Sequence, residues 1–361
     1  MSTFEYVGGA YRVLFGRGTL QQLPSALEKL NANAVMILST PQQVDEAERI
    51  KSLIGQSAVT VFSEATMHTP ISVTEKAVRV AKEKKVDSIV SIGGGSTIGL
   101  GKAISVRTGL PHLCIPTTYA GSEMTPILGE TDQGRKVTRR DPRILPESAV
   151  YDIDLTRSLP VRLSVYSGIN AIAHAVEALY ASNTNPIIDL MAVEGIRNLA
   201  KALPVLRDDD QNDDARYEAL YGAWLCGICL GSANMGLHHK LCHTLGGTFN
   251  LPHAETHVTV LPHALAFNAP AVPGPMAKIA SALPDSGGDA VRGISNLYRR
   301  LKIDSSLRGY GMPERGIDMA ADLVMSNPYK NPRPLERRAI RELIRRAWAG
   351  EDADYFHGRL T

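Results

Sequence analysis

The chain has 361 residues, 44% of them hydrophobic and 21% charged, with a formal net charge of +2. This length exceeds one ordinary hydrophobic core and predicts about two domains, while the balanced charge excludes the basic surface typical of nucleic-acid-binding proteins. The sequence lacks both a secretory signal pattern and a run of about 18 apolar residues, so we expect a cytoplasmic protein without membrane contact.

Short apolar runs alternate with helical patterns in the first part of the chain, which is typical of a parallel sheet with crossover helices. The expected strands cover residues 34–38, 59–62, 88–92 and 112–116, and an expected helix covers residues 73–84. Near residue 160 the strand patterns stop, and helical patterns continue to the end. We therefore predict an α/β domain over residues 1–159 and an all-helical domain over residues 160–361.

A glycine-rich segment follows the expected strand at 88–92 and opens a helix. It consists of Gly93, Gly94, Gly95, Ser96 and Thr97. A backbone without side chains can approach a pyrophosphate closely, and the helix start supplies N–H groups and positive dipole charge. This context predicts a nucleotide phosphate site in the α/β domain. The alternative is a tight turn without a ligand.

Polar residues follow two other expected strands. Ser39 and Thr40 end the strand at 34–38. The strand at 112–116 is followed by Thr117, Thr118, Tyr119 and Ser122. Carboxyl ends of parallel strands share one edge of a sheet, where open α/β folds bind ligands. We expect these segments to lie beside the glycine-rich loop.

Histidines are concentrated in the second half, where four of the ten lie between His238 and His253. His239 and His243 are four residues apart, so a helix presents both rings on one face. Gly246 and Gly247 predict the end of that helix, after which the chain can fold back and bring His253 to the same place.

A second helical pattern carries Asn170, His174 and Glu177 at i, i+4 and i+7 among apolar residues. Such a spacing forms one polar stripe along an otherwise apolar helix. The stripe faces either water or a polar cavity.

Together these motifs resemble the iron-containing, or group III, alcohol dehydrogenases. The resemblance runs from Gly16-x-Gly18 through both loops and the histidine segment to residues 331–335. It implies the dehydroquinate synthase-like fold of that family, an α/β dinucleotide-binding domain followed by an all-α catalytic domain. It also implies that the two loops bind a nicotinamide dinucleotide. Ser39 and Thr40 stand where many relatives carry an Asp that repels a 2′-phosphate, so we expect NADPH to be accepted as well as NADH.

The resemblance also implies a metal site, with one replacement. The family holds a divalent metal with an Asp-x-x-x-His helix and later histidines, which correspond here to His174, His239 and His253. Asn170 occupies the place of the ligand Asp. An amide is neutral and a poor ligand for a transition metal. We therefore expect that no metal is required.

The branch of the family with Asn at this position resembles this chain most, and it reduces the carbon–carbon double bond of maleylacetate to 3-oxoadipate in the degradation of aromatic compounds. A conjugated ketone spreads the charge of hydride addition over an enolate, which hydrogen-bond donors can hold. Histidine suits proton donation near neutral pH. The resemblance implies that the residue at the place of His243 lies next to the nicotinamide rather than on the metal, so His243 is expected to donate the proton. His174, His239 and His253 would shape the pocket.

The implied substrate carries two carboxylates, for which cationic side chains are suitable partners. The candidate substrate-binding residues are Asn170, Lys136, Arg139, Arg140 and Arg333. Solvated loop charges are the alternative for Arg139 and Arg140. The resemblance further implies a homodimer.

Three alternatives stay open. One is an alcohol or polyol dehydrogenase in which three histidines hold zinc or iron. Another is a lyase of the dehydroquinate synthase type, which uses NAD only transiently. The last is a non-enzymatic sensor, which any turnover would exclude.

Overall fold

The computed structural model describes residues 12–132 and 135–353. The chain divides into two compact units, one ending at Pro160 and one beginning at Val161. The assignment of a separate role to each unit stays a prediction. No single helix in the described part of the chain is long and apolar enough to cross a membrane. Only the pair α7 (Asp213–Ser232) and α8 (Leu237–Phe249), bent by 91°, passes that test by length and composition.

The first unit contains a six-stranded sheet in which all neighbours are parallel, in the order β1-β8-β5-β4-β2-β3. The strands are β1 (Arg12–Gly16), β2 (Val35–Leu38), β3 (Ala58–Phe62), β4 (Ser88–Gly93), β5 (His112–Pro116) and β8 (Ser148–Asp152). The four expected strands and the expected fold class are confirmed. β1 and β8 were not predicted.

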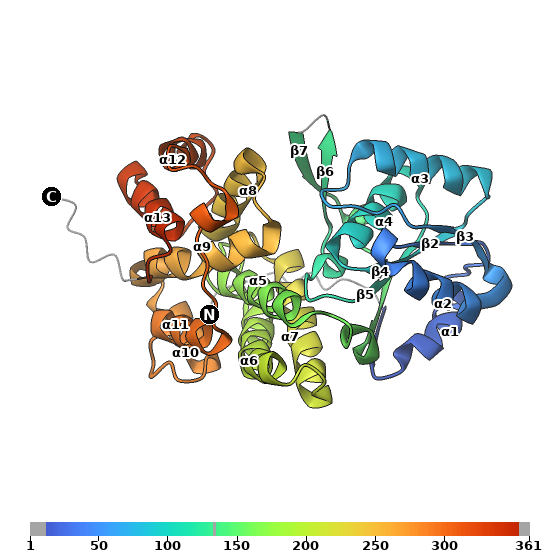
Figure 1. Cartoon of the computed structure of the whole chain (residues 1–361), viewed down its shortest axis with the longest axis horizontal. Helices are drawn as coiled ribbons and strands as arrows, with labels where there is room; N and C mark the ends of the chain where they lie inside the picture. Colours follow the sequence, from blue (N-terminus) through green and yellow to red (C-terminus); the bar gives the residue numbers. More distant parts are fainter. Residues whose placement is uncertain (1–11, 133–134, 354–361) are drawn as a thin grey trace. The chain divides into compact units, whose positions relative to one another are not determined.

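Helices cover both faces of the sheet (Figure 1). Val35 and Ile37 of β2 pack in one apolar core with α1 (Leu23–Glu28) and α2 (Val44–Ile54). Met36 and Leu38 point the other way, into a core with α3 (Ile71–Glu83) and α4 (Gly95–Thr108). Alternation along a strand that is buried on both faces explains why its residues are all apolar.

Because the strands are parallel, the carboxyl ends of β2, β4 and β5 lie at one edge of the sheet. The strand order changes direction between β2 and β4, and such a point is where open α/β sheets bind ligands. An antiparallel hairpin of β6 (Ile127–Asp132) and β7 (Arg135–Arg140) follows the loop after β5. Several of its residues are charged, so no alternation of apolar and polar residues predicts it.

The described part of the second unit is helical throughout (Figure 1). Its α-helices are α5 (Val161–Leu179), α6 (Pro186–Asp208), α7 (Asp213–Ser232), α8 (Leu237–Phe249), α9 (His253–Asn268), α10 (Pro273–Ala282), α11 (Ala290–Leu301), α12 (Gly316–Ser326) and α13 (Arg337–Ala349). One apolar core joins α8, α9, α12 and α13. The four cysteines are free and buried.

The expected helix end at Gly246 and Gly247 is wrong, because α8 continues through both to Phe249. Asn250 ends it in the left-handed conformation, with φ of 53°. Glycine weakens a helix without forbidding it, and Leu245 and Phe249 pack in the apolar core on either side of the pair. The chain then turns back into α9, as expected.

Candidate active site

The glycine-rich loop forms a narrow backbone cradle at the start of α4. Gly93 has φ of +144°, and a Cβ added there would lie 2.6 Å from Oε1 of Gln43 and 2.7 Å from Oγ1 of Thr97. A Cβ on Gly94 would lie 3.0 Å from the side chain of Thr118. Glycine is therefore required by space as well as conformation. An exposed Gly95 at the helix start fits a phosphate group.

Side-chain hydrogen bonds connect the loops after β2 and β5 beside this cradle. Nε2 of Gln43 donates to Oγ1 of Thr117 at 3.1 Å, and Oγ1 of Thr40 donates to Oε1 of Gln43 at 3.4 Å. Ser39, Thr97 and Tyr119 are buried, whereas Ser96, Thr118 and Ser122 are half-buried. The expected segments thus meet at one edge of the sheet.

Sequence reasoning missed Lys102, a fully buried lysine of α4. Its Nζ donates to the carbonyl of Ser122, to Oγ1 of Thr125 at 2.9 Å and to the carbonyl of Ile127 at 3.0 Å. Burial lowers the pKa of Lys102 to about 8. The signal that could have revealed it is a lysine among the small and apolar residues of α4.

The candidate cationic residues lie in different settings. Nη2 of Arg139 is 2.5 Å from Oε2 of the buried Glu130, and Arg140 is exposed. Lys136 is on β7, but its side chain is outside the described part. In the second unit, Nη1 of Arg333 donates to the carbonyl of Phe267 at 2.8 Å, and its guanidinium lies 4.4 Å from the centre of the Phe267 ring.

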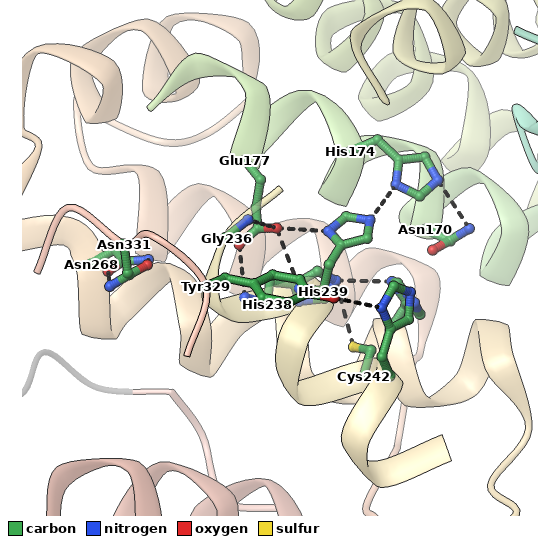
Figure 2. Close-up of polar contacts among 12 residues, drawn as sticks. Asn170, His174, Glu177, Gly236, His238, His239, Cys242, Asn268, Tyr329 and Asn331 are labelled. Carbon is green, nitrogen blue, oxygen red and sulfur yellow. Dashed lines mark hydrogen bonds and ion pairs between the residues drawn. The ribbon is translucent and has the colours of Figure 1, made fainter. Parts of the chain in front are cut away.

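The polar stripe of α5 is buried, so it faces the interior of the second unit (Figure 2). Nδ1 of His174 lies 2.9 Å from Nε2 of His239, and Nδ2 of Asn170 lies 3.4 Å from Nε2 of His174. These contacts bring together two helices that are more than 60 residues apart in the sequence.

Glu177, on the same stripe, accepts hydrogen bonds from N–H groups at the start of α8. Oε2 accepts from the backbone of Gly236 at 2.9 Å and from Nδ1 of His239 at 2.7 Å, and Oε1 accepts from the backbone of His238 at 2.7 Å. Burial raises the pKa of Glu177, but hydrogen bonds from the side chain of His239 and the backbone of Gly236 help to outweigh it, and the pKa is lowered to about 2. The group is therefore a carboxylate.

Two further histidines belong to the cluster, and sequence reasoning gave them no role. Nε2 of His238 is 3.0 Å from Nδ1 of His257. The His257 ring centre lies 4.4 Å from that of His253 and 5.0 Å from that of His239. The His243 ring lies 6.1 Å from His239. The spacing of four between 253 and 257 on one helix was the missed signal.

His238 and His257 also converge with Cys242, and their potential ligand atoms all lie within 4.8 Å of one another. Burial lowers the pKa of His238 to about 3 and that of His257 well below its usual range. Both rings are therefore neutral at pH 7 and carry lone pairs.

Comparison with protein families matches both parts of the chain. Residues 10–153 match the model described as iron-containing alcohol dehydrogenase. Residues 164–348 match the C-terminal model of the Fe-containing alcohol dehydrogenase family. The two matches together cover most of the chain.

Several similar proteins are named maleylacetate reductase. The protein of Burkholderia cepacia is 53% identical over 97% of this chain and 99% of its own length, and that of Sphingobium indicum is 50% identical over 96% and 98%. The crystal structure of maleylacetate reductase from Agrobacterium tumefaciens has a TM-score of 0.94 and 49% identity, covering 98% of this chain and all of that one. These relatives are oxidoreductases.

The expectation that no metal is required is wrong, because both matching models describe iron-containing enzymes. The side chains also fit an ion. Oδ1 of Asn170 is buried and has no hydrogen-bond partner in the described part of the chain. Imidazole nitrogens are ligands that iron(II) and zinc accept. Asn170 lacks the negative charge of an Asp, but its amide keeps an oxygen atom.

The fold, the cradle at the start of α4 and the histidine cluster agree with these matches over the length of the chain. The chain therefore belongs to the iron-containing alcohol dehydrogenase family.

Proposed function

We propose that this chain reduces the carbon–carbon double bond of maleylacetate to give 3-oxoadipate, with NADH or NADPH as the reductant. The main support for this proposal is the 53% identity to a maleylacetate reductase over 97% of the chain. The aligned region spans both units, so it includes the cofactor loops and the histidine cluster. The reaction belongs to the degradation of aromatic compounds.

The first unit binds the dinucleotide in this proposal. Backbone atoms of Gly93, Gly94 and Gly95 and the start of α4 hold the pyrophosphate, and the cradle has no space for side chains at Gly93 and Gly94. The remaining contacts come from Ser39, Thr40, Ser96, Thr97, Thr117, Thr118, Tyr119 and Ser122. When bound, the reduced nicotinamide supplies the hydride.

The second unit supplies the metal ligands and the proton. Asn170, His174, His239 and His253 would hold a divalent ion, which would place positive charge near a ketone oxygen. Hydride addition at the carbon β to the ketone gives an enolate, and His243 donates a proton to its α-carbon. Nδ1 of His243 is 3.5 Å from the hydroxyl of Tyr329.

The substrate's carboxylates would pair with cationic groups. Lys136, Arg139, Arg140 and Arg333 are the proposed partners, and bidentate contacts favour the arginines. The carboxylate of Glu130 already holds Arg139, and the Phe267 carbonyl holds Arg333, so both guanidinium groups are oriented before substrate arrives.

A cytoplasmic location and a homodimer complete the proposal, without a nucleic-acid or membrane partner. The net charge of +2 supports the absence of a nucleic-acid partner.

A second candidate function is a metal-dependent alcohol or polyol dehydrogenase, which the descriptions of both family models favour. An assay at the NADH absorbance band separates the two. We expect NADH oxidation with maleylacetate and little change with a panel of simple aldehydes, or with NAD and alcohols. Faster turnover of simple alcohols would contradict the proposal.

The proton donor has its own test. His243→Ala is expected to lower kcat about 10²- to 10⁴-fold, the usual contribution of a general acid. His263→Ala is a matched control, because His263 is buried on α9 outside the set of ring contacts that joins the cluster. Equal losses in both variants would contradict a chemical role for His243.

A further inference from the structure

Glu177 accepts four hydrogen bonds at the start of α8, although it has no assigned role in catalysis or metal binding. Besides the three contacts described above, Oε2 lies 3.3 Å from the backbone N–H of His239. The side chain is fully buried, and Figure 2 shows it between α5 and the start of α8. A buried carboxylate with four donors is fixed in one orientation.

The carboxylate determines which nitrogen of His239 carries hydrogen. A carboxylate accepts hydrogen bonds only, so Nδ1 of His239, 2.7 Å away, is the protonated nitrogen. Nε2 then carries the lone pair. This nitrogen lies 2.9 Å from Nδ1 of His174, on the side of the ring that faces α5.

We propose that Glu177 is a positioning residue for the metal centre, which orients His239 through Nδ1 and supplies the negative charge that Asn170 does not. The proposal rests on the ligand set given under Proposed function. All four proposed ligands are neutral, whereas Glu177 is an anion separated from the ion by one imidazole ring. A carboxylate behind a ligating histidine raises its basicity and fixes its orientation.

Glu177 also satisfies the first N–H groups of α8, so a purely structural role has to be separated from this one. Glu177→Gln keeps the size of the side chain and one acceptor oxygen, but it removes the charge and presents an N–H group. A structural role predicts loss of stability alone. A positioning role predicts loss of metal affinity in protein that is still folded.

The test titrates the metal-stripped full chain with Zn²⁺ by calorimetry and with Co²⁺ by visible absorption. We expect Glu177→Gln to weaken Zn²⁺ binding about 10- to 100-fold and to change the Co²⁺ spectrum. The matched control is Glu123→Gln, which removes another buried carboxylate, bonded to the hydroxyl of Tyr151 at 2.7 Å in the first unit. This control should bind both ions like the unaltered protein.

A second variant tests the charge directly. Asn170→Asp, combined with Glu177→Gln, should recover most of the lost affinity because it returns one negative charge to the site. Absence of recovery would overturn the claim that Glu177 supplies the missing charge.

Failure of this inference is distinguishable from failure of the ligand set. Zn²⁺ binding that is unchanged in Glu177→Gln but lost in His239→Ala overturns the role of Glu177 alone. Unchanged binding in His239→Ala overturns the ligand set and the inference with it. If Glu177→Gln does not fold, ¹¹³Cd–¹⁵N coupling in the unaltered protein decides: coupling to Nε2 of His239 supports the inference, and coupling to Nδ1 overturns it.

Discussion

The first unit buries the charged side chain of Lys102 completely and the second unit buries that of Glu177, and these two charges have opposite signs. Lys102 of the first unit is surrounded by carbonyl and hydroxyl oxygens of the loop after β5. Glu177 of the second unit is surrounded by backbone and imidazole N–H groups. In both cases the chain itself replaces the water that the charge loses on folding.

Lys102 and Glu177 differ in the kind of groups to which they are hydrogen-bonded. Lys102 fixes a loop whose carbonyls each keep a second lone pair, whereas Glu177 accepts from buried N–H groups that each have a single hydrogen. Removing the anion should therefore cost more than removing the cation. This ranking of the two buried charges is testable.

The largest effect is expected for Glu177→Leu, which leaves several buried N–H groups without an acceptor. We expect the free energy of unfolding of the second unit to fall by about 3–5 kcal/mol. Urea unfolding followed by tryptophan fluorescence reports on this unit, since both tryptophans, Trp224 and Trp348, lie in it. A loss below that of Lys102→Met would reverse the ranking.

Lys102→Met should follow, with a loss of about 2–3 kcal/mol, because the half-buried carbonyls of Ser122 and Ile127 lose their donor. The KM for NADH should rise more than kcat falls, since the loop after β5 loses its anchor. Lys82→Met, at an exposed position of α3, is the control. An unchanged KM would show that the loop does not depend on Lys102.

A pH titration sharpens the comparison in the first unit. Burial and, to a smaller extent, the nearby charge of Lys102 lower the pKa of His112 to about 3, so the folded unit excludes a proton that the unfolded chain binds below pH 6.5, the usual pKa of histidine. The stability is complete above pH 6.5 and is lost as the pH falls toward 3, by about 2 kcal/mol at pH 5. His112→Gln should flatten the dependence measured by urea unfolding at pH 7 and pH 5. An unchanged slope would contradict this assignment.

The smallest effect is expected at the half-buried Thr40, where a new carboxylate should oppose a 2′-phosphate. Thr40→Asp should lower the ratio of kcat/KM for NADPH to that for NADH by roughly tenfold or more. The exposed Gln42→Asp is the control for net charge. Equal ratios in both variants would place the 2′-phosphate elsewhere.

The fold could be predicted where one segment carries its own pattern. The strands β2, β3, β4 and β5 are short apolar runs, and the glycine-rich loop follows one of them, so periodicity and position were sufficient. β1 and β8 pair with each other although more than 130 residues separate them in the sequence. Neither segment alone carries a pattern that reveals this pairing. The length of α8 depended on packing of Leu245 and Phe249, which outweighed its two glycines.

The candidate site was predictable to a similar degree. The spacing of His239 and His243 predicted correctly that one helix, α8, carries both. For the polar stripe on α5 the sequence allowed either water or a polar cavity, and the stripe is buried. The bond between Glu177 and His239 joins residues 62 apart, so spacing could not reveal it. The metal prediction was wrong because it judged Asn170 by charge alone and not by the oxygen that the amide retains.

That unpaired amide oxygen also has an evolutionary consequence. Codons for asparagine and aspartate differ at one nucleotide, so one point mutation at position 170 would restore the anionic ligand of related alcohol dehydrogenases. The surrounding pocket already accommodates an oxygen at this position. Laboratory selection for a new substrate could therefore begin at this codon.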